Sequence, residues 1–368
     1  MVFSAHAEFD WTLEDNNFTI SAPSNFTAQR YLYNFDRLRF QLNFNQDNLF
    51  ATAILDGNTF YGKKYVNSLD YQFAQQFQPD TTFTTQSNWY SSNSTQFNAK
   101  VYRLYAGFEN DNNRLVVGLQ NITMGVGRLW TPTNIFNPNN PFAIEPDETP
   151  GVAAINYSRH LTDMSELSAV VSKRADDSTK YALRYKAFVG FGDFAIDYIK
   201  STQSEMLGFE VEGNLAGTGI EIRSEIAHIK TMLLNQNKQT KFTQIILGAD
   251  YGFKNGISLS TEALYSSKTF TRSQQLDNFN AEISNNIAFS HLSLGVVLTY
   301  SFNINFDISV TAIQSFNDNN SLFISPVVNY SINDKYSLSL GTLINSGSDE
   351  SEFGKFDDTY YLKFETSF

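Results

Sequence analysis

The segment DDTYYLKFETSF, residues 357–368, alternates between apolar and polar side chains at the end of the sequence. Successive side chains of a strand point to opposite faces, so one face of this segment is apolar and the other is mostly polar. The apolar face carries Tyr360, Leu362, Phe364 and Phe368. A chain that ends on such a strand favours pairing on both strand edges, as in a closed barrel. We therefore predict an all-β protein with this segment in the wall of a barrel.

The composition of the 368 residues supports a barrel that crosses a membrane. Aromatic side chains make up 15% and charged ones 17%, and no stretch of 18 apolar residues occurs. That absence excludes a helical membrane protein, whereas alternating segments rich in Tyr, Phe, Asn and Ser are typical of transmembrane β-barrels. The net charge of −12 argues against a nucleic-acid partner. Because the chain has no cysteine, disulfides and cysteine-based metal sites are excluded.

Alternating segments recur along the whole chain, bounded by clusters of Asn, Asp, Gly or Ser. We predict an antiparallel up-and-down barrel of 18 strands, at residues 10–20, 31–44, 49–57, 97–109, 114–124, 151–159, 166–174, 180–189, 193–201, 206–214, 218–230, 241–252, 256–267, 287–302, 304–315, 320–331, 335–345 and 357–368. Sixteen strands is the alternative if two segments are loops. Short and long connections largely alternate, as periplasmic turns and outer loops do in outer-membrane barrels. A short helix is expected at 67–77, inside the longest loop.

The start of the chain carries an export signal. Ala5 and Ala7 form an A-x-A pattern of the kind that signal peptidase cleaves. We therefore expect residues 1–7 to be a signal-peptide remnant, and residues 8–368 to form a single transmembrane barrel domain.

Charged side chains fall on the face that alternation turns inward. The basic ones are Arg37, Arg39, Arg103, Arg184, Lys186, Arg223 and Lys363. The acidic ones include Glu210, Glu212, Glu221, Glu225 and Glu262. A dry core could not hold so many charges, because an unpaired buried charge is very costly. The pattern favours a water-filled channel over a soluble β-protein such as a secreted adhesin.

The segment GRLWTPTNIFNPNNPFAIEPDETPG, residues 127–151, carries five of the eight prolines. Proline lacks an N–H group and has a fixed φ, so this segment is no central strand. It is also too apolar for a solvated surface loop, and it must therefore pack against another part of the protein. By position it is the third outer loop of the predicted barrel.

With the barrel size, the C-terminal aromatic strand and the cleavage pattern, this loop makes the chain resemble Gram-negative outer-membrane porins. The resemblance covers the full length as architecture and matches no subfamily motif. It implies that the third loop folds into the lumen, with the acids Glu145, Asp147 and Glu148 facing a basic wall. That wall would comprise Arg37, Arg39, Arg103, Arg184 and Lys186, with Arg128 contributed by the loop itself. The open alternative is an outer cap held by proline and aromatic packing.

The implied function is passive diffusion of small hydrophilic solutes or ions through a bacterial outer membrane, filtered by size and charge. The resemblance implies contact with outer-membrane lipid and lipopolysaccharide, and no cofactor or metal. The assembly signal would be Tyr360, Leu362, Phe364 and Phe368, read by the barrel-assembly machinery. Monomer and homotrimer both stay open.

Two other functions fit single features of the sequence. A barrel of this size could be a sheath around a periplasmic electron carrier, which would require an open lumen. His291 and Ser293 resemble the His-x-Ser pair of the outer-membrane phospholipase, but alternation turns them away from lipid, so we expect no enzyme. The acidic segments 318–323 and 347–358 suit either calcium or solvated loop tips.

Overall fold

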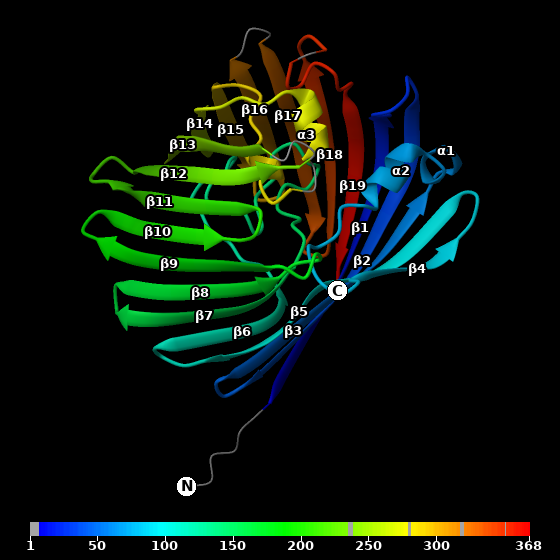
Figure 1. Ribbon diagram of the computed structural model, residues 1–368. Helices are drawn as coiled ribbons and strands as arrows, with labels where there is room; N and C mark the ends of the chain where they lie inside the picture. The colour runs from blue at the N-terminus through cyan, green and yellow to red at the C-terminus, as the bar shows by residue number, and fades with distance from the viewer. Residues whose placement is uncertain (1–6, 235–237, 279–280, 317–319, 350) are drawn as a thin grey trace.

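A computed structural model describes residues 7–234, 238–278, 281–316, 320–349 and 351–368. These residues form a closed barrel of 18 antiparallel strands (Figure 1). The last strand, β19, pairs with β18 on one edge and with β1 on the other. The predicted 18-stranded barrel is therefore confirmed. The predicted signal remnant lies outside the described residues except for Ala7.

The barrel strands are β1 (Glu8–Pro23), β2 (Arg30–Gln46), β3 (Leu49–Tyr61), β5 (Thr95–Glu109), β6 (Asn113–Gln120), β7 (Val152–Thr162), β8 (Ser165–Lys173), β9 (Thr179–Val189), β10 (Gly192–Lys200), β11 (Ser204–Leu215), β12 (Ile220–Leu233), β13 (Lys238–Gly252), β14 (Ile257–Ser266), β15 (Leu292–Asn303), β16 (Phe306–Phe316), β17 (Ser321–Asn333), β18 (Tyr336–Ser346) and β19 (Thr359–Ser367). The helices are α1 (Lys63–Val66), α2 (Leu69–Ala74), α3 (Arg272–Asp277) and a 3₁₀ turn at Ser284–Asn286. The helix expected at 67–77 is α2, and Ser68 caps its first turn by accepting a hydrogen bond from the Tyr71 N–H. None of the described helices is long and apolar enough to cross a membrane.

Three details differ from the sequence prediction. A short strand, β4 (Gln86–Ser91), pairs with the first half of β5 and has no apolar alternation to reveal it. β6 ends at Gln120, because Ile122 and Met124 bury their side chains in an apolar cluster after the chain leaves the sheet. β15 begins at Leu292, later than predicted, because Ile287 before it is buried in the same apolar cluster as Ile122 and Met124.

The two faces of the wall follow the predicted alternation. On β15, Leu292, Leu294 and Leu298 are exposed on the outer face, whereas Ser293 is buried inside. On β2, Leu38 is exposed and its neighbour Arg37 is buried. The outer face is therefore an apolar band, as expected where lipid is the solvent.

The core of the molecule lies inside the barrel and is made with the connection between β6 and β7. We call residues 121–151 the β6–β7 loop. Its apolar side chains Ile122, Met124, Ile135 and Phe136 join a buried cluster with inward residues of β7 to β13. On another side Leu129, with Trp130 and Phe142, packs on a second cluster that includes inward residues of β15 to β18. The teal trace of the loop accordingly lies within the ring of strands in Figure 1.

The position of Gly118 in β6 requires a residue without a side chain, and this requirement can be tested. Its φ is +132°, and an added Cβ would lie 2.3 Å from the backbone oxygen of Leu104. We expect Gly118→Val to lose about 1–3 kcal/mol from backbone strain alone, with more from the collision. Thermal unfolding, read as the heat-dependent shift on SDS gels, measures the loss.

Gly252→Val in β13 is the matched control, since a Cβ there meets nothing within 4 Å. Equal melting temperatures for the two variants would contradict the assigned strain.

Candidate functional site

Carboxylates from three neighbouring parts of the wall hold the β6–β7 loop by its backbone. Glu210 on β11, Glu225 on β12 and Glu262 on β14 are each buried to at least 99%. Glu225 accepts hydrogen bonds from the N–H groups of Val126 at 2.6 Å and Gly127 at 2.7 Å. Its second oxygen accepts from Thr133, through both the N–H and the hydroxyl group. The loop therefore supplies this carboxyl group with the hydrogen bonds that water would otherwise provide.

Glu262 repeats this arrangement one step further along the loop. Its oxygens accept from the N–H groups of Arg128 at 2.9 Å, Leu129 at 3.1 Å and Trp130 at 2.8 Å. The guanidinium of Arg223 lies 3.2 Å from the same carboxylate. Successive backbone N–H groups that converge on one anion form a concave binding site, and a hydrogen bond to a charged group contributes about 1.5–3 kcal/mol.

Glycine permits this wrapping. Gly125 has a φ of +89°, donates its N–H to Glu210 at 2.8 Å, and lies against Glu225. At Gly127 an added Cβ would sit 1.8 Å from the Trp130 carbonyl oxygen. The sequence places the wall glutamates in the lumen but does not reveal their partner. The glycines at 125 and 127 are the sequence signal that could have pointed to the loop as that partner.

The opposite edge of the loop is tied to β2 by ion pairs. Arg37 binds Glu145 at 2.8 Å and lies 3.5 Å from Glu148. Arg39 binds Glu148 at 2.8 Å and Asp56 of β3 at 2.7 Å. Two predicted arginines and two predicted loop acids thus come together, although their roles in selection stay predictions.

Arg103 also lies at this edge. It donates to the backbone oxygen of Thr149 at 2.8 Å, and its guanidinium stacks 4.0 Å from the centre of the Tyr102 ring. Arg103 therefore holds the end of the loop by its backbone and pairs with none of the predicted loop acids.

The other predicted site residues lie elsewhere. Arg184 pairs with Asp197 and with Glu210, next to the loop anchor. Lys186 pairs with Asp193 and is half exposed near the β9–β10 turn. Asp147 is exposed.

Arg128 faces acids of the wall. Its guanidinium lies 3.0 Å from Glu212 and 2.9 Å from Glu221. Arg128 therefore does not continue the basic group formed by Arg37 and Arg39. The predicted single basic wall is divided into separate, locally neutralised clusters.

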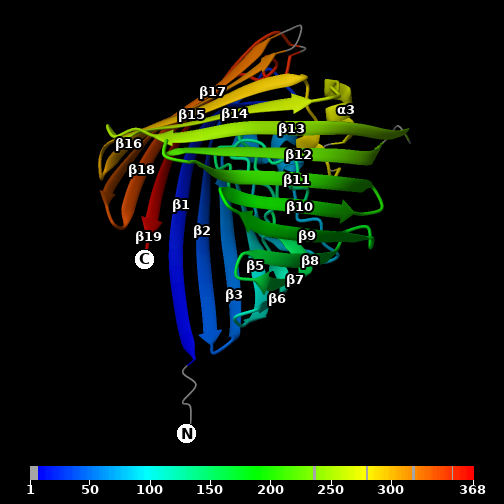
Figure 2. The same cartoon turned by 90° about the vertical axis from the view of Figure 1, so that its left-hand side faces the viewer.

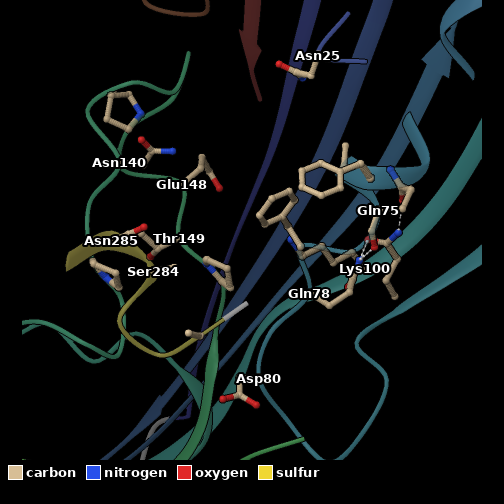
Figure 3. A pocket seen from close by; sticks show the side chains of 18 of the residues that line it. Asn25, Gln75, Gln78, Asp80, Lys100, Asn140, Glu148, Thr149, Ser284 and Asn285 are labelled. Carbon is tan, nitrogen blue, oxygen red and sulfur yellow. Dashed lines mark hydrogen bonds between the residues drawn. The ribbon is translucent and has the colours of Figure 1, made fainter. Parts of the chain in front are cut away.

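A cavity of about 1380 Å³ lies between the β6–β7 loop and the connections that precede β2, β5 and β15. Figure 3 shows Glu148 and Thr149 on one side of it, and Gln75, Gln78 and Lys100 across from them. Lys100 makes no ion pair among the described residues, and its amine lies 5.7 Å from the Tyr102 ring centre. The cavity therefore combines a free ammonium group with a carboxylate that is already paired.

Aromatic rings form a second side of this cavity. The ring centres of Phe18 and Phe35 are 5.6 Å apart, and those of Phe35 and Phe60 are 4.8 Å apart, both nearly parallel. Phe35 and Phe60 line the cavity directly. The row runs across β1, β2 and β3, on the same inward face as Arg37.

The sequence offered two alternative sites, the His-x-Ser pair and the acidic segments. Neither comes together as a site among the described residues. His291 precedes β15, is exposed, and places Nδ1 2.7 Å from the Ser266 carbonyl oxygen. Over the part of the chain that the structure describes, no group of three or more His, Asp or Glu side chains could hold a metal ion. Residues 318, 319 and 350 of the two acidic segments lie outside that part.

The comparisons with known proteins identify the fold. No family model matches the sequence, and no curated protein matches it. The structure matches the outer membrane protein opdK from Pseudomonas aeruginosa with 8% identity and a TM-score of 0.60, covering 98% of this chain and 99% of that one. OpdK solved with vanillate matches with 8% identity, a TM-score of 0.61 and 98% coverage of both chains. Acinetobacter baumannii OccAB1 matches with 10% identity, a TM-score of 0.61, and coverage of 98% of this chain and 96% of that chain.

At these identities the likeness concerns the fold. The chain has the architecture of large outer-membrane β-barrels over nearly its full length, as the sequence predicted.

The wall carboxylates should fix the loop. We expect Glu225→Ala to expose residues 121–151 to protease, because three backbone N–H groups and the Thr133 hydroxyl group lose an acceptor. Limited proteolysis with mass-spectrometric mapping of the cuts measures this effect. Glu166→Ala is the control, since the Glu166 carboxylate accepts from Ser168 on its own strand. Equal cleavage of the two variants would mean that apolar packing alone holds the loop.

The ion pair of Glu148 should give a defined pH dependence. Burial raises the pKa of Glu148, but the Arg39 hydrogen bond and the charges of Arg37 and Arg39 lower it more, to about 2 from an ordinary 4.5. A depressed pKa stabilises the folded state above the unfolded pKa, and that stabilisation is lost as the pH falls. We expect the melting-temperature difference between wild type and Glu148→Gln to persist at pH 5 and to shrink between about 4.5 and 2. A difference that does not change over this interval would contradict the assigned pair.

Proposed function

We propose that this protein is a passive channel of a bacterial outer membrane, through which small hydrophilic solutes or ions diffuse. The observation that carries the proposal is the sorting of the wall. Apolar side chains face outward around the barrel, and charged side chains face inward on β2, β9, β11, β12, β14 and β19. A closed barrel with a lipid-compatible surface and an ionic lumen is suited to passage across a membrane.

The β6–β7 loop is the element that restricts passage in this proposal. Its carboxylate anchors hold it against β12 and β14, and its ion pairs hold it against β2. A solute that enters the cavity would therefore meet the layer formed by Arg37, Glu145 and Glu148. Because these side chains are fixed in place, the layer filters by size through the loop and by charge through the arrangement of its ion pairs.

The chemistry of the cavity favours small anions with an apolar part. Lys100 supplies an unpaired positive charge, and Phe35 and Phe60 supply flat apolar surface. A structurally similar protein, OpdK, has been solved with vanillate, an aromatic carboxylate. That likeness supports the same class of solute here, since both barrels have the same fold.

The sheath alternative is disfavoured, because a protein partner needs an open lumen and the loop contacts both sides of this one. We also propose that the apolar outer face contacts outer-membrane lipid and lipopolysaccharide. We propose that the barrel-assembly machinery recognises β19, because Tyr360, Leu362 and Phe364 are exposed on its outer face. Phe368 is also exposed, just beyond the strand.

Replacing both Arg37 and Arg39 by Gln should shift ion selectivity toward cations. Two positive charges are removed, so the lumen becomes more negative. Asp56 and Glu148 lose their arginine partners, and Glu145 keeps only Lys363. Reversal potentials of the refolded protein in a planar bilayer under a salt gradient measure the shift.

Arg114→Gln is the control, since its pair with Glu109 is exposed near the β5–β6 turn. An unchanged reversal potential in the Arg37 and Arg39 variant would remove these residues from the filter. Refolded wild-type protein that inserts and yet carries no current would overturn the channel itself.

A further inference from the structure

The connection between α2 and β4 has no regular secondary structure and runs along the large cavity. We call residues 76–85 of this connection the strap. Its two ends are joined to each other, because the Gln86 side chain donates to the Gln75 side chain at 2.7 Å. The Gln78 amide donates to both of these residues, at 3.0 Å and 3.3 Å. The strap is therefore a closed loop with a narrow neck made of glutamine side chains.

The strap separates the cavity from solvent. Phe77, Gln78 and Asp80 line the cavity. Phe77 and Phe83 are nevertheless each 51% exposed. The buried residues of the strap are Pro79, Thr81 and Thr85. A segment with so few buried groups opens at a low cost in free energy compared with the strands beside it.

One carboxylate ties the tip of the strap to the turn that follows β8. Asp80 accepts a hydrogen bond from Nε of Arg174 at 2.7 Å and another from the Ala175 N–H at 2.9 Å. Figure 3 shows Asp80 at the lower edge of the cavity, apart from Gln75 and Gln78 at the neck. The Asp80 side chain is 46% exposed, so water can replace both of these bonds.

The other partner of Arg174 is fixed in place. Glu282, in the connection between β14 and β15, lies 3.1 Å from Nε of Arg174, and the two side chains are only 1% and 5% exposed. Lys180 lies 3.5 Å from Glu282 and donates to the Ile135 carbonyl oxygen of the β6–β7 loop at 3.1 Å. The Ser201 hydroxyl group, just after β10, donates to Glu282 as well. Figure 2 shows α3, in the same connection as Glu282, at the end of the barrel where β10 ends.

Arg174 thus shares its charge between a buried carboxylate and an exposed one. An exposed ion pair contributes little to stability, whereas breaking a buried pair leaves an uncompensated charge and is very costly. If Asp80 leaves, Arg174 keeps Glu282, and the Asp80 carboxylate enters water. The strap can therefore release its tip without leaving a buried charge unpaired.

We propose that the strap is a lid over the cavity, hinged at the Gln75–Gln86 neck and closed by Asp80 on Arg174. When the tip moves away, the part of the cavity lined by Ser172, Arg174 and Lys180 opens to solvent. The lid differs from the β6–β7 loop, which buried carboxylates hold in place. It governs entry into the cavity whether or not the barrel conducts.

The absence of cysteine from the chain allows a direct test. Ser172→Cys places one thiol on β8, at a position that lines the cavity and is 3% exposed. The rate at which this thiol reacts with N-ethylmaleimide in the refolded protein, followed by mass spectrometry, measures opening. We expect Asp80→Ala in the same chain to raise the rate about two- to fivefold, the range that corresponds to loss of an exposed ion pair.

Asp176→Ala is the matched control. The Asp176 carboxylate also pairs with Arg174, at 3.3 Å, and its side chain is 48% exposed, but it belongs to the turn after β8. We expect this variant to react at the rate of Ser172→Cys alone. Equal rates in all three proteins would mean that the strap does not close the cavity. An equal rise in both aspartate variants would assign the effect to Arg174, and either result would overturn the lid.

A second experiment locks the strap. Asp80→Cys combined with Ala175→Cys is bridged by a short, reducible bis-methanethiosulfonate, and current is recorded in a planar bilayer. We expect the bridge to lower the mean current and to suppress transitions between current levels, and a reductant to reverse both effects. A current that the bridge leaves unchanged would overturn the lid. Wild-type protein that carries no current would instead count against the channel, and the thiol reaction rates would still decide the lid.

Discussion

Buried carboxylates on the barrel wall need hydrogen-bond donors, and the arrangement of the lumen depends on how they obtain them. Glu225 and Glu262 are almost fully buried and take their donors from the backbone of the β6–β7 loop. Leaving either charge unpaired in this environment would be far more costly than ordering the loop around it. The loop therefore follows a path that brings its N–H groups to the wall, and its position decides what space is left in the lumen.

The two edges of the loop are held by different chemistry. On the β12 and β14 side, neutral backbone N–H groups surround the buried carboxyl groups of Glu225 and Glu262. On the β2 side, Arg37 and Arg39 pair with loop acids. Between them, apolar residues such as Leu129 pack on inward side chains of β15 to β18. This packing explains why Val297, alone among the inward residues of its strand, is a large apolar residue, since it contacts that cluster. The lumen is thus partly a packed core and partly a cavity.

The outer surface shows the same dependence on solvent. Where lipid is the solvent, the wall is apolar and needs no specific partner. Asp15 and Asp36 interrupt that band on β1 and β2.

Strand number, the inward charges and the unusual β6–β7 loop could all be predicted from the sequence, because alternation of apolar and polar residues reports directly on the two faces of a strand. β4 could not, since its six residues lack that alternation and are ordered by pairing with β5. Nor could the partners of the wall glutamates, or the division of the basic residues into separate clusters, be read from local pattern. Arg128 and Arg37 look alike in sequence, yet the path of the loop brings one to Glu212 and the other to Glu145. The sequence by itself determined the architecture, because each strand records its own two environments. Only the tertiary structure decided which charges meet, because those contacts join segments about a hundred residues apart whose distance is set by barrel closure.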